Sequence, residues 1–287
     1  MKILLLGHKG MLGSDLLEQM SHHHEVIGMD VDEIDITSVG DCVKAIEETK
    51  PQIIINAAAY TNVDGCETAK EKCFAVNAEA LKNIAEACRN KNIRIVHFST
   101  DYVFNGNGKS PYKEEDECDP INTYGASKLA GERYLQTLAQ NYIIIRTAWL
   151  YGANGKNFVR TILEKAKTTP RLTVVDDQLG SPTHTKDLAA AVDLLIEKNA
   201  QGIFHVTNRG SCSWYQFAVK ILQEAGIDDV EVSPIKSDQL ARLAKRPAYS
   251  VLSMQKFIST TGKVMQPWQL GLKDYLESVK ARLHTLT

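Results

Sequence analysis

A tyrosine and a lysine four residues apart are the first residues whose types and spacing suggest chemistry. Tyr124 and Lys128 stand in the segment YGASK, where a helix is expected to begin. Residues four apart share one helix face, so the two side chains would lie together. A phenol has a pKa of about 10, and a neighbouring ammonium favours the phenolate and lowers that pKa. The pair is therefore suited to proton transfer at neutral pH.

A hydroxyl upstream completes this set. Thr100 ends the apolar run before DYVF and could hold a substrate oxygen. Tyr124 would then donate a proton to a carbonyl oxygen while hydride arrives from a nicotinamide, and Lys128 could also bond the nicotinamide ribose. Alone, a tyrosine and a lysine at this spacing are more often part of an exposed amphipathic helix. The catalytic interpretation depends on a dinucleotide site elsewhere in the chain.

A glycine-rich turn near the N-terminus predicts that site. GHKGMLG follows the apolar run Ile3–Leu6 with its glycines spaced G-x-x-G-x-x-G, and Asp30 ends the next strand-like run. Glycines permit a tight turn and let N–H groups at a helix N-terminus approach a pyrophosphate. A glycine pattern alone is weak evidence, but a strand before it and a helix after it strengthen the prediction. The predicted turn residues are Gly7, Lys9, Gly10, Met11, Leu12 and Gly13.

Two further segments are predicted to line the same cofactor cleft. Asp35 and Ile36 could cover an adenine by a hydrogen bond and an apolar contact. Small side chains after the third strand would let the cofactor lie flat across the strand ends, although they could equally serve helix–sheet packing. These residues are Ala57, Ala58, Ala59 and Tyr60.

The elements that must position these residues alternate between strand and helix. Short apolar runs predict strands at 3–6, 26–29, 53–56, 93–98 and 142–146, and helices are expected near 11–20, 39–49, 73–89 and 124–138. This alternation is typical of an α/β fold with a Rossmann-type, doubly wound parallel sheet, whose ligands bind at the carboxyl ends of the strands. We therefore predict a dinucleotide-binding domain over 1–150 and a smaller C-terminal substrate-binding lobe over 151–287, with the two lobes interleaved.

Composition excludes several classes of function. The 287 residues carry a net charge of −2, so the sequence indicates neither nucleic acid nor an anionic membrane as a partner. We find no apolar run of the roughly 18 residues that would span a bilayer, and expect no signal peptide. The six scattered cysteines are expected to be reduced thiols of a cytoplasmic protein. His22–His24 is interpreted as a solvated turn rather than a metal site.

Several motifs together resemble one enzyme family. GHKGMLG, NAAAYTNVD, STDYVF, YGASKLAGE, IIRTAWLYG, GKNFV, DQLGSPT and RPAYSVL make nearly the whole chain similar to the dTDP-4-dehydrorhamnose reductases, within the extended short-chain dehydrogenase/reductase superfamily. The resemblance implies reduction of the 4-keto group of dTDP-4-dehydro-6-deoxy-L-mannose to dTDP-L-rhamnose. It also implies that Thr100, Tyr124 and Lys128 are catalytic and that Asp101 and Trp149 contact the substrate.

Other polar residues fit a nucleotide-sugar substrate. Asn157, Gln178 and Arg246 could bond phosphate, sugar hydroxyls or the thymine edge, and Arg246 has the fork geometry that suits a diphosphate. Arg246 could equally be a surface arginine, and Trp149 could be a core residue between the lobes.

The resemblance also narrows the alternatives. Dehydratases of the superfamily carry Asp-Glu after the threonine, whereas this chain has Asp101-Tyr102, so dehydration is not expected. No cysteine follows Ser99-Thr100, which leaves a double epimerisation unsupported. A reductase of another 4-keto nucleotide-sugar and a non-catalytic NADP-binding regulatory subunit remain open. Enteric members are thought to bind magnesium at a dimer interface with glutamates. Asp15 stands at one such position, but the other ligands cannot be placed in this sequence, so we allow a homodimer and assign no magnesium ion to it.

Two residues make conflicting predictions about the cofactor. A carboxylate such as Asp30 normally bonds the ribose 2′-hydroxyl of NADH and repels a 2′-phosphate. Related reductases with a basic residue at the position of Lys9 use it to meet the 2′-phosphate of NADPH. Lys9 could also be a solvated loop side chain, and Asp30 a cap at the strand end. We predict a modest preference for NADPH, with NADH accepted.

Overall fold

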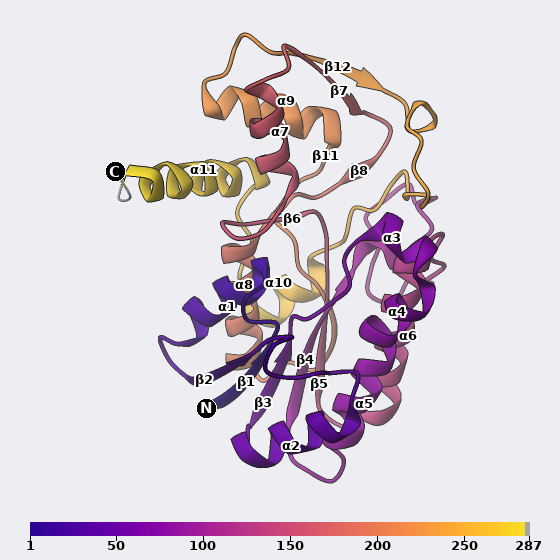
Figure 1. Cartoon of the computed structure of the whole chain (residues 1–287), viewed down its shortest axis with the longest axis vertical. Helices are drawn as coiled ribbons and strands as arrows, with labels where there is room; N and C mark the ends of the chain where they lie inside the picture. Colours follow the sequence, from indigo (N-terminus) through magenta and orange to yellow (C-terminus); the bar gives the residue numbers. More distant parts are fainter. Residues whose placement is uncertain (285–287) are drawn as a thin grey trace.

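Six parallel strands form the central sheet of the larger lobe (Figure 1), in the order β10-β5-β4-β3-β1-β2. The strands are β1 (Lys2–Leu6), β2 (Glu25–Met29), β3 (Ile53–Asn56), β4 (Arg94–Thr100), β5 (Tyr142–Thr147) and β10 (Gly202–His205). The computed structural model describes residues 1–284. Five of these strands lie where apolar runs predict them, and the predicted α/β fold with a doubly wound parallel sheet is confirmed.

Helices cover both faces of this sheet, which explains why its strands read as continuous apolar runs. One face packs against α1 (Met11–Met20), α8 (Thr185–Glu197) and α10 (Gln255–Thr261). The other packs against α2 (Val39–Thr49), α5 (Ala80–Ala87) and α6 (Thr123–Leu138). Because side chains alternate along a strand, Val96 and Phe98 of β4 join the first core and Ile95 joins the second.

The helical segment before β4 is divided into several elements. The helix predicted over 73–89 is present as α4 (Lys70–Phe74), the π-helical segment η1 (Ala75–Glu79) and α5, with α3 (Val63–Thr68) before them. Gly131 of α6 lies against the carbonyl oxygen of Asn77 in η1, where any Cβ would overlap it. A close backbone approach therefore fixes the distance between α6 and η1.

The smaller lobe lies above the carboxyl ends of the strands (Figure 1). Its helices are α7 (Phe158–Ala166), α9 (Trp214–Ala225) and α11 (Trp268–His284), and its short strand pairs are β7 (Arg171–Val175) with β12 (Glu231–Ile235), β8 (Leu179–Gly180) with β11 (Cys212–Ser213), and β6 (Leu150–Tyr151) with β9 (Thr183–His184). Two 3-10 turns, η2 (Asp101–Val103) and η3 (Ser237–Gln239), complete the elements. Tyr151, Phe217 and Trp268 belong to the core of this lobe.

The chain passes between the lobes more than once. After residue 150 it enters the smaller lobe, but α8, β10 and α10 return to the larger one. The predicted boundary at residue 150 therefore follows β1 to β5, and three elements after it, α8, β10 and α10, also belong to the larger lobe. Within residues 1–284, no helix is both long and apolar enough to cross a membrane.

Candidate active site

The turn between β1 and α1 is built to accept a ligand at the helix N-terminus. Gly7 has φ +80°, and a Cβ there would lie 2.7 Å from the backbone nitrogen of Ala58. A Cβ on Gly13 would overlap the Gly7 carbonyl oxygen. Gly10 is the N-cap of α1 and provides no side-chain cap, so the N–H groups of the first turn stay available. These features fit a pyrophosphate held by backbone donors.

A cavity of 490 Å³ extends from this turn along the ends of β1, β2 and β3. Most of the predicted cofactor residues line it, namely Gly7, Lys9, Gly10, Asp30, Asp35, Ile36, Ala57, Ala58, Ala59 and Tyr60. Ile34 and Val76 also line it and were not predicted from the sequence. Asp35 accepts hydrogen bonds from the N–H and hydroxyl of Thr37, which orients its carboxylate.

Lys9 is surrounded by carboxylates. Its backbone N–H donates to Asp30 at 2.9 Å, and its Nζ lies 2.5 Å from Asp32 and 2.7 Å from Glu33. The hydrogen bonds that the Lys9 ammonium donates to these two carboxylates raise the pKa of Lys9 to about 12. A 2′-phosphate near Lys9 would therefore compete with two exposed acids, which the sequence alone does not identify as partners of this lysine.

A second cavity, of 570 Å³, adjoins the first, since Gly10, Ala57 and Ala59 line both. It brings together the predicted residues Met11, Leu12, Thr100, Asp101, Tyr124, Lys128 and Trp149. Lys156 and Trp214 line it as well. The two cavities form one elongated site, in which a dinucleotide could extend from the adenosine end to the catalytic residues.

Tyr124 and Lys128 project from the start of α6, whose N-cap is Asn122. Burial, followed by the nearby Asp101 carboxyl, raises the pKa of Tyr124 above its ordinary value. This is opposite to the lowering expected from Lys128. Nζ of Lys128 lies 3.1 Å from Nε2 of His97, and burial lowers the pKa of this lysine to about 8. The protein alone therefore holds Tyr124 as a phenol, the form that donates a proton.

Asp101 lies fully inside this cavity wall. Its carboxyl accepts hydrogen bonds from the Thr100 hydroxyl at 3.0 Å and from the Ser250 hydroxyl at 2.5 Å. Burial raises the pKa of Asp101 to about 7, although these hydrogen bonds oppose the shift. Ser250, which stands in the RPAYSVL segment, thus ties the C-terminal part of the chain to the end of β4.

Two indoles form the wall contributed by the smaller lobe. Trp149 stacks on Trp214, with ring centroids 3.6 Å apart and planes at 9°. The backbone of Trp149 has φ +50°, a conformation that residues other than glycine rarely adopt. Gly180 allows this arrangement, because a Cβ there would overlap the indole of Trp149. Trp214 is the first residue of α9, and the sequence does not indicate that it stacks on Trp149.

Three predicted substrate residues serve the protein itself instead of lining the catalytic cavity. Asn157 caps α7 by accepting from the Arg160 N–H and donates to the Gly152 carbonyl. Gln178 donates to the Ser237 hydroxyl at 2.8 Å. Arg246 places both terminal nitrogens on Asp64, at 2.7 and 2.6 Å. Their contacts with substrate stay predictions, and a diphosphate at Arg246 would have to share the guanidinium with Asp64.

The position discussed for magnesium is also occupied by an internal contact. Asp15 is buried between α1 and α8, where it accepts a hydrogen bond from the Thr185 hydroxyl. Across the residues that the structure describes, no three histidine, cysteine, aspartate or glutamate side chains form a group that could hold a metal ion. All six cysteines carry free thiols.

Two solved structures and a further relative are similar to this chain over nearly its whole length. A reported dTDP-4-dehydrorhamnose reductase of Clostridium acetobutylicum is 43% identical, with a TM-score of 0.94, and the match covers 98% of this chain and all of that one. A dTDP-4-dehydrorhamnose reductase of Bacillus anthracis, solved in complex with NADP, is 36% identical with a TM-score of 0.93 over 96% and 99% of the two chains. The spore coat polysaccharide biosynthesis protein SpsK of Bacillus subtilis is 40% identical over 96% of this chain and 97% of its own.

The family model described as the RmlD substrate binding domain matches residues 1–281. That match and the relatives confirm the resemblance seen in the motifs, and the chain belongs to this family of dTDP-4-dehydrorhamnose reductases.

Proposed function

We propose that this protein is an NADPH-dependent reductase that converts dTDP-4-dehydro-6-deoxy-L-mannose to dTDP-L-rhamnose. The observation that carries the proposal is the convergence of Thr100, Tyr124 and Lys128 on a cavity that adjoins the glycine-turn cavity. The names of its relatives support this substrate and an NADP cofactor. A non-catalytic nucleotide-binding subunit would have no need of the three catalytic side chains.

The residues of the cavity can carry out the proton transfer. NADPH, when bound along the glycine turn, would supply the hydride that attacks the sugar C4. The Thr100 hydroxyl would bond the carbonyl oxygen, and Tyr124, kept as a phenol by burial, would give it a proton. Lys128 would stabilise the phenolate that remains and bond the nicotinamide ribose. The indole pair of Trp149 and Trp214 would cover the sugar face.

The cofactor preference is the finer part of this proposal. Lys9 favours a 2′-phosphate, but Asp30, Asp32 and Glu33 lie around it. We therefore expect NADPH to be preferred only modestly and NADH to be accepted.

A panel of 4-keto-6-deoxy sugars linked to dTDP, UDP and GDP tests the substrate. We expect the fastest loss of reduced-cofactor absorbance with the dTDP-linked L-mannose derivative. Faster turnover of a UDP- or GDP-linked sugar would identify a reductase of another nucleotide-sugar. If none of the sugars is turned over, the proposal that this protein is a nucleotide-sugar reductase is wrong.

A further inference from the structure

A buried histidine lies directly behind the catalytic lysine. His97 is on β4, two residues after Ile95, so it faces the side of the sheet that α6 covers. It is fully buried, and its Nε2 lies 3.1 Å from Lys128 Nζ. Its Nδ1 lies 3.4 Å from the side-chain nitrogen of Asn56, whose side-chain oxygen accepts from the Ala58 N–H. The ring also hydrogen-bonds the backbone carbonyl of Asn56, and the proton for this bond belongs on Nδ1 because Nε2 faces the Lys128 ammonium. The ring is thus fixed between β3 and α6.

Among the titratable groups around Lys128, the His97 ring is the one that its ammonium contacts at hydrogen-bond distance. Tyr124 and Glu132 share its helix, Cys73 faces it from α4, and His97 faces it from β4. In the described part of the chain, no carboxylate forms an ion pair with Lys128.

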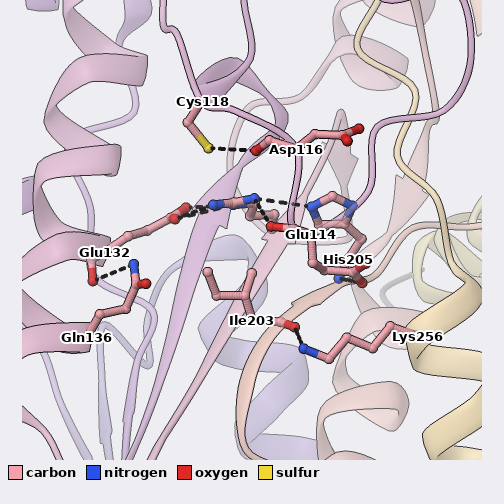
Figure 2. A network of polar contacts seen from close by, with 9 residues as sticks. Glu114, Asp116, Cys118, Glu132, Gln136, Ile203, His205 and Lys256 are labelled. Atoms are coloured by element: carbon pink, nitrogen blue, oxygen red, sulfur yellow. Dashed lines mark hydrogen bonds and ion pairs between the residues drawn. The ribbon is translucent and has the colours of Figure 1, made fainter.

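The carboxylate of Glu132 is already paired. It accepts from Arg146 of β5, with the closest distance 2.7 Å from Nη2 to Oε2. Figure 2 shows this network, in which Glu132, Glu114 and His205 lie around the same guanidinium. The acid one turn after Lys128 therefore balances Arg146, and the positive charge of Lys128 stays largely uncancelled.

We propose that His97 is a positioning residue for the reduction: its neutral imidazole accepts a hydrogen bond from Lys128 and holds the ammonium beside Tyr124 without cancelling its charge. A carboxylate in this place would fix the lysine equally well but would neutralise the charge that must stabilise the Tyr124 phenolate. Burial and the nearby Lys128 keep the pKa of His97 well below its ordinary value, so the ring stays neutral at working pH. This inference rests on the proposed function only for its kinetic readout.

Two substitutions at position 97 separate positioning from packing. His97→Leu removes the acceptor, whereas the side-chain oxygen of His97→Gln can still accept from Lys128. His205→Gln is the matched control, because His205, on β10, is also a fully buried neutral histidine but bonds the Tyr112 carbonyl. For each folded variant we would measure kcat and KM from about pH 6 to pH 9, and the Kd of NADPH by fluorescence over the same range.

Loss of the acceptor should destabilise the Lys128 ammonium. In the wild type, kcat should fall as pH rises through about 8, where Lys128 loses its proton. His97→Leu should move this fall to lower pH by about one to two pH units, the effect of one hydrogen bond to a charged group. At pH 7 kcat should then drop by roughly 2- to 10-fold, and NADPH binding should weaken in the same pH-dependent way. His97→Gln should recover most of both effects, and His205→Gln should leave the position of the fall unchanged.

An unchanged alkaline fall in His97→Leu, or the same displacement in His97→Gln, would overturn the proposal. If His97→Leu does not fold, His97→Phe, which keeps a planar ring but offers no acceptor, takes its place with the same expected and contradicting results. A wild type that turns over no dTDP-sugar, while His97→Leu still alters the pH dependence of NADPH binding, would contradict the proposed function and leave the role of His97 standing.

Discussion

Tyr124 and Lys128 have different surroundings, and these surroundings suggest separate roles. Tyr124 is half-buried next to Asp101, which favours its neutral phenol, whereas Lys128 is buried against a neutral imidazole. Their shared helix face follows from a spacing of four residues, and so it could be predicted. The partner of Lys128 could not, since nothing in the sequence states which buried residue of β4 faces α6.

Tyr124→Phe removes the proton donor and keeps the ring. We expect kcat to fall by roughly 100- to 10,000-fold, the usual contribution of general acid catalysis, with the Kd of NADPH nearly unchanged. Steady-state kinetics and fluorescence titration measure the two effects. Retention of more than about a tenth of wild-type turnover would show that another group is the acid.

We expect Lys9 to set the preference for NADPH over NADH, which differ by the 2′-phosphate on the adenosine ribose. Lys9→Ala should abolish the modest preference for NADPH and spare NADH, because only the phosphate needs the positive charge. Asp32→Asn should raise the preference, since it frees the Lys9 ammonium from one of its two carboxylates. The measurement is kcat/KM for each cofactor in all three proteins. An NADH-preferring wild type, or equal losses with both cofactors in Lys9→Ala, would exclude this role.

The role of a polar residue is hardest to predict when its hydrogen-bond partner is distant in the sequence. The guanidinium fork of Arg246 suits a diphosphate, and in this structure it bonds Asp64, 182 positions away, and the Ala244 carbonyl. Asn157 caps α7, a role that the sequence signals by placing an asparagine before a helix. Contacts of either residue with the substrate stay predictions. Side-chain chemistry predicts what a residue can bond, whereas the tertiary fold decides which partner it meets.

At the scale of elements, strand and helix periodicity predicted most of the larger lobe. β1, β3 and β5 lie within one residue of their predicted ends because they are buried on both faces. The π-helical turn η1 and the return of β10 to the sheet were missed, since local pattern contains no information about the strand beside which a segment will pair.

The contact between α6 and η1 holds the catalytic helix in place. Gly131→Ala should force the two backbones apart, because the new Cβ would overlap the Asn77 carbonyl oxygen. We expect a loss of about 1–3 kcal/mol in the free energy of unfolding, measured by chemical denaturation. Gly40→Ala in α2 is the control: the nearest atom to its Cβ is 3.8 Å away, so it should be neutral or slightly stabilising. Equal effects of the two changes would contradict this view of the contact.

The indole pair joins the residue before β6 to the first residue of α9 on one wall of the catalytic cavity. Trp149→Ala should raise the KM for substrate more than the KM for cofactor, because the indole lies on the wall provided by the smaller lobe. Trp214→Ala should act in the same direction by removing the ring on which Trp149 stacks. Proportional increases in both KM values, or a collapse of the melting temperature in either variant, would instead identify the pair as core.

At the scale of the whole molecule, two interleaved lobes enclose the site, so its electrostatics affect overall stability. Asp101 is buried with its pKa raised to about 7, and it bonds Ser250 from a distant part of the chain.

Two predictions made from the sequence concern the assembly and location of the whole molecule. A homodimer and a cytoplasmic location stay predictions.

This buried carboxyl should make folding depend on pH. Its pKa is higher in the folded state than in the unfolded chain, so the protonated form stabilises the fold. That contribution is complete below about pH 4 and is lost as pH rises to about 7, with an upper bound on the order of 4 kcal/mol. Asp101→Asn should remove this dependence, so its stability relative to the wild type should grow between pH 4 and 7 and then level off. A constant difference across that range, measured by urea denaturation, would contradict a neutral Asp101.

Transfer of an isotope label tests the central claim most directly. The enzyme would be incubated with dTDP-4-dehydro-6-deoxy-L-mannose and NADPH deuterated at the transferable position of nicotinamide C4, and the product examined by NMR and mass spectrometry. Our account predicts dTDP-L-rhamnose with one deuterium at the sugar C4, formed by the wild type and nearly absent with Tyr124→Phe. A sugar that stays unreduced, or that is reduced without the label, would contradict it.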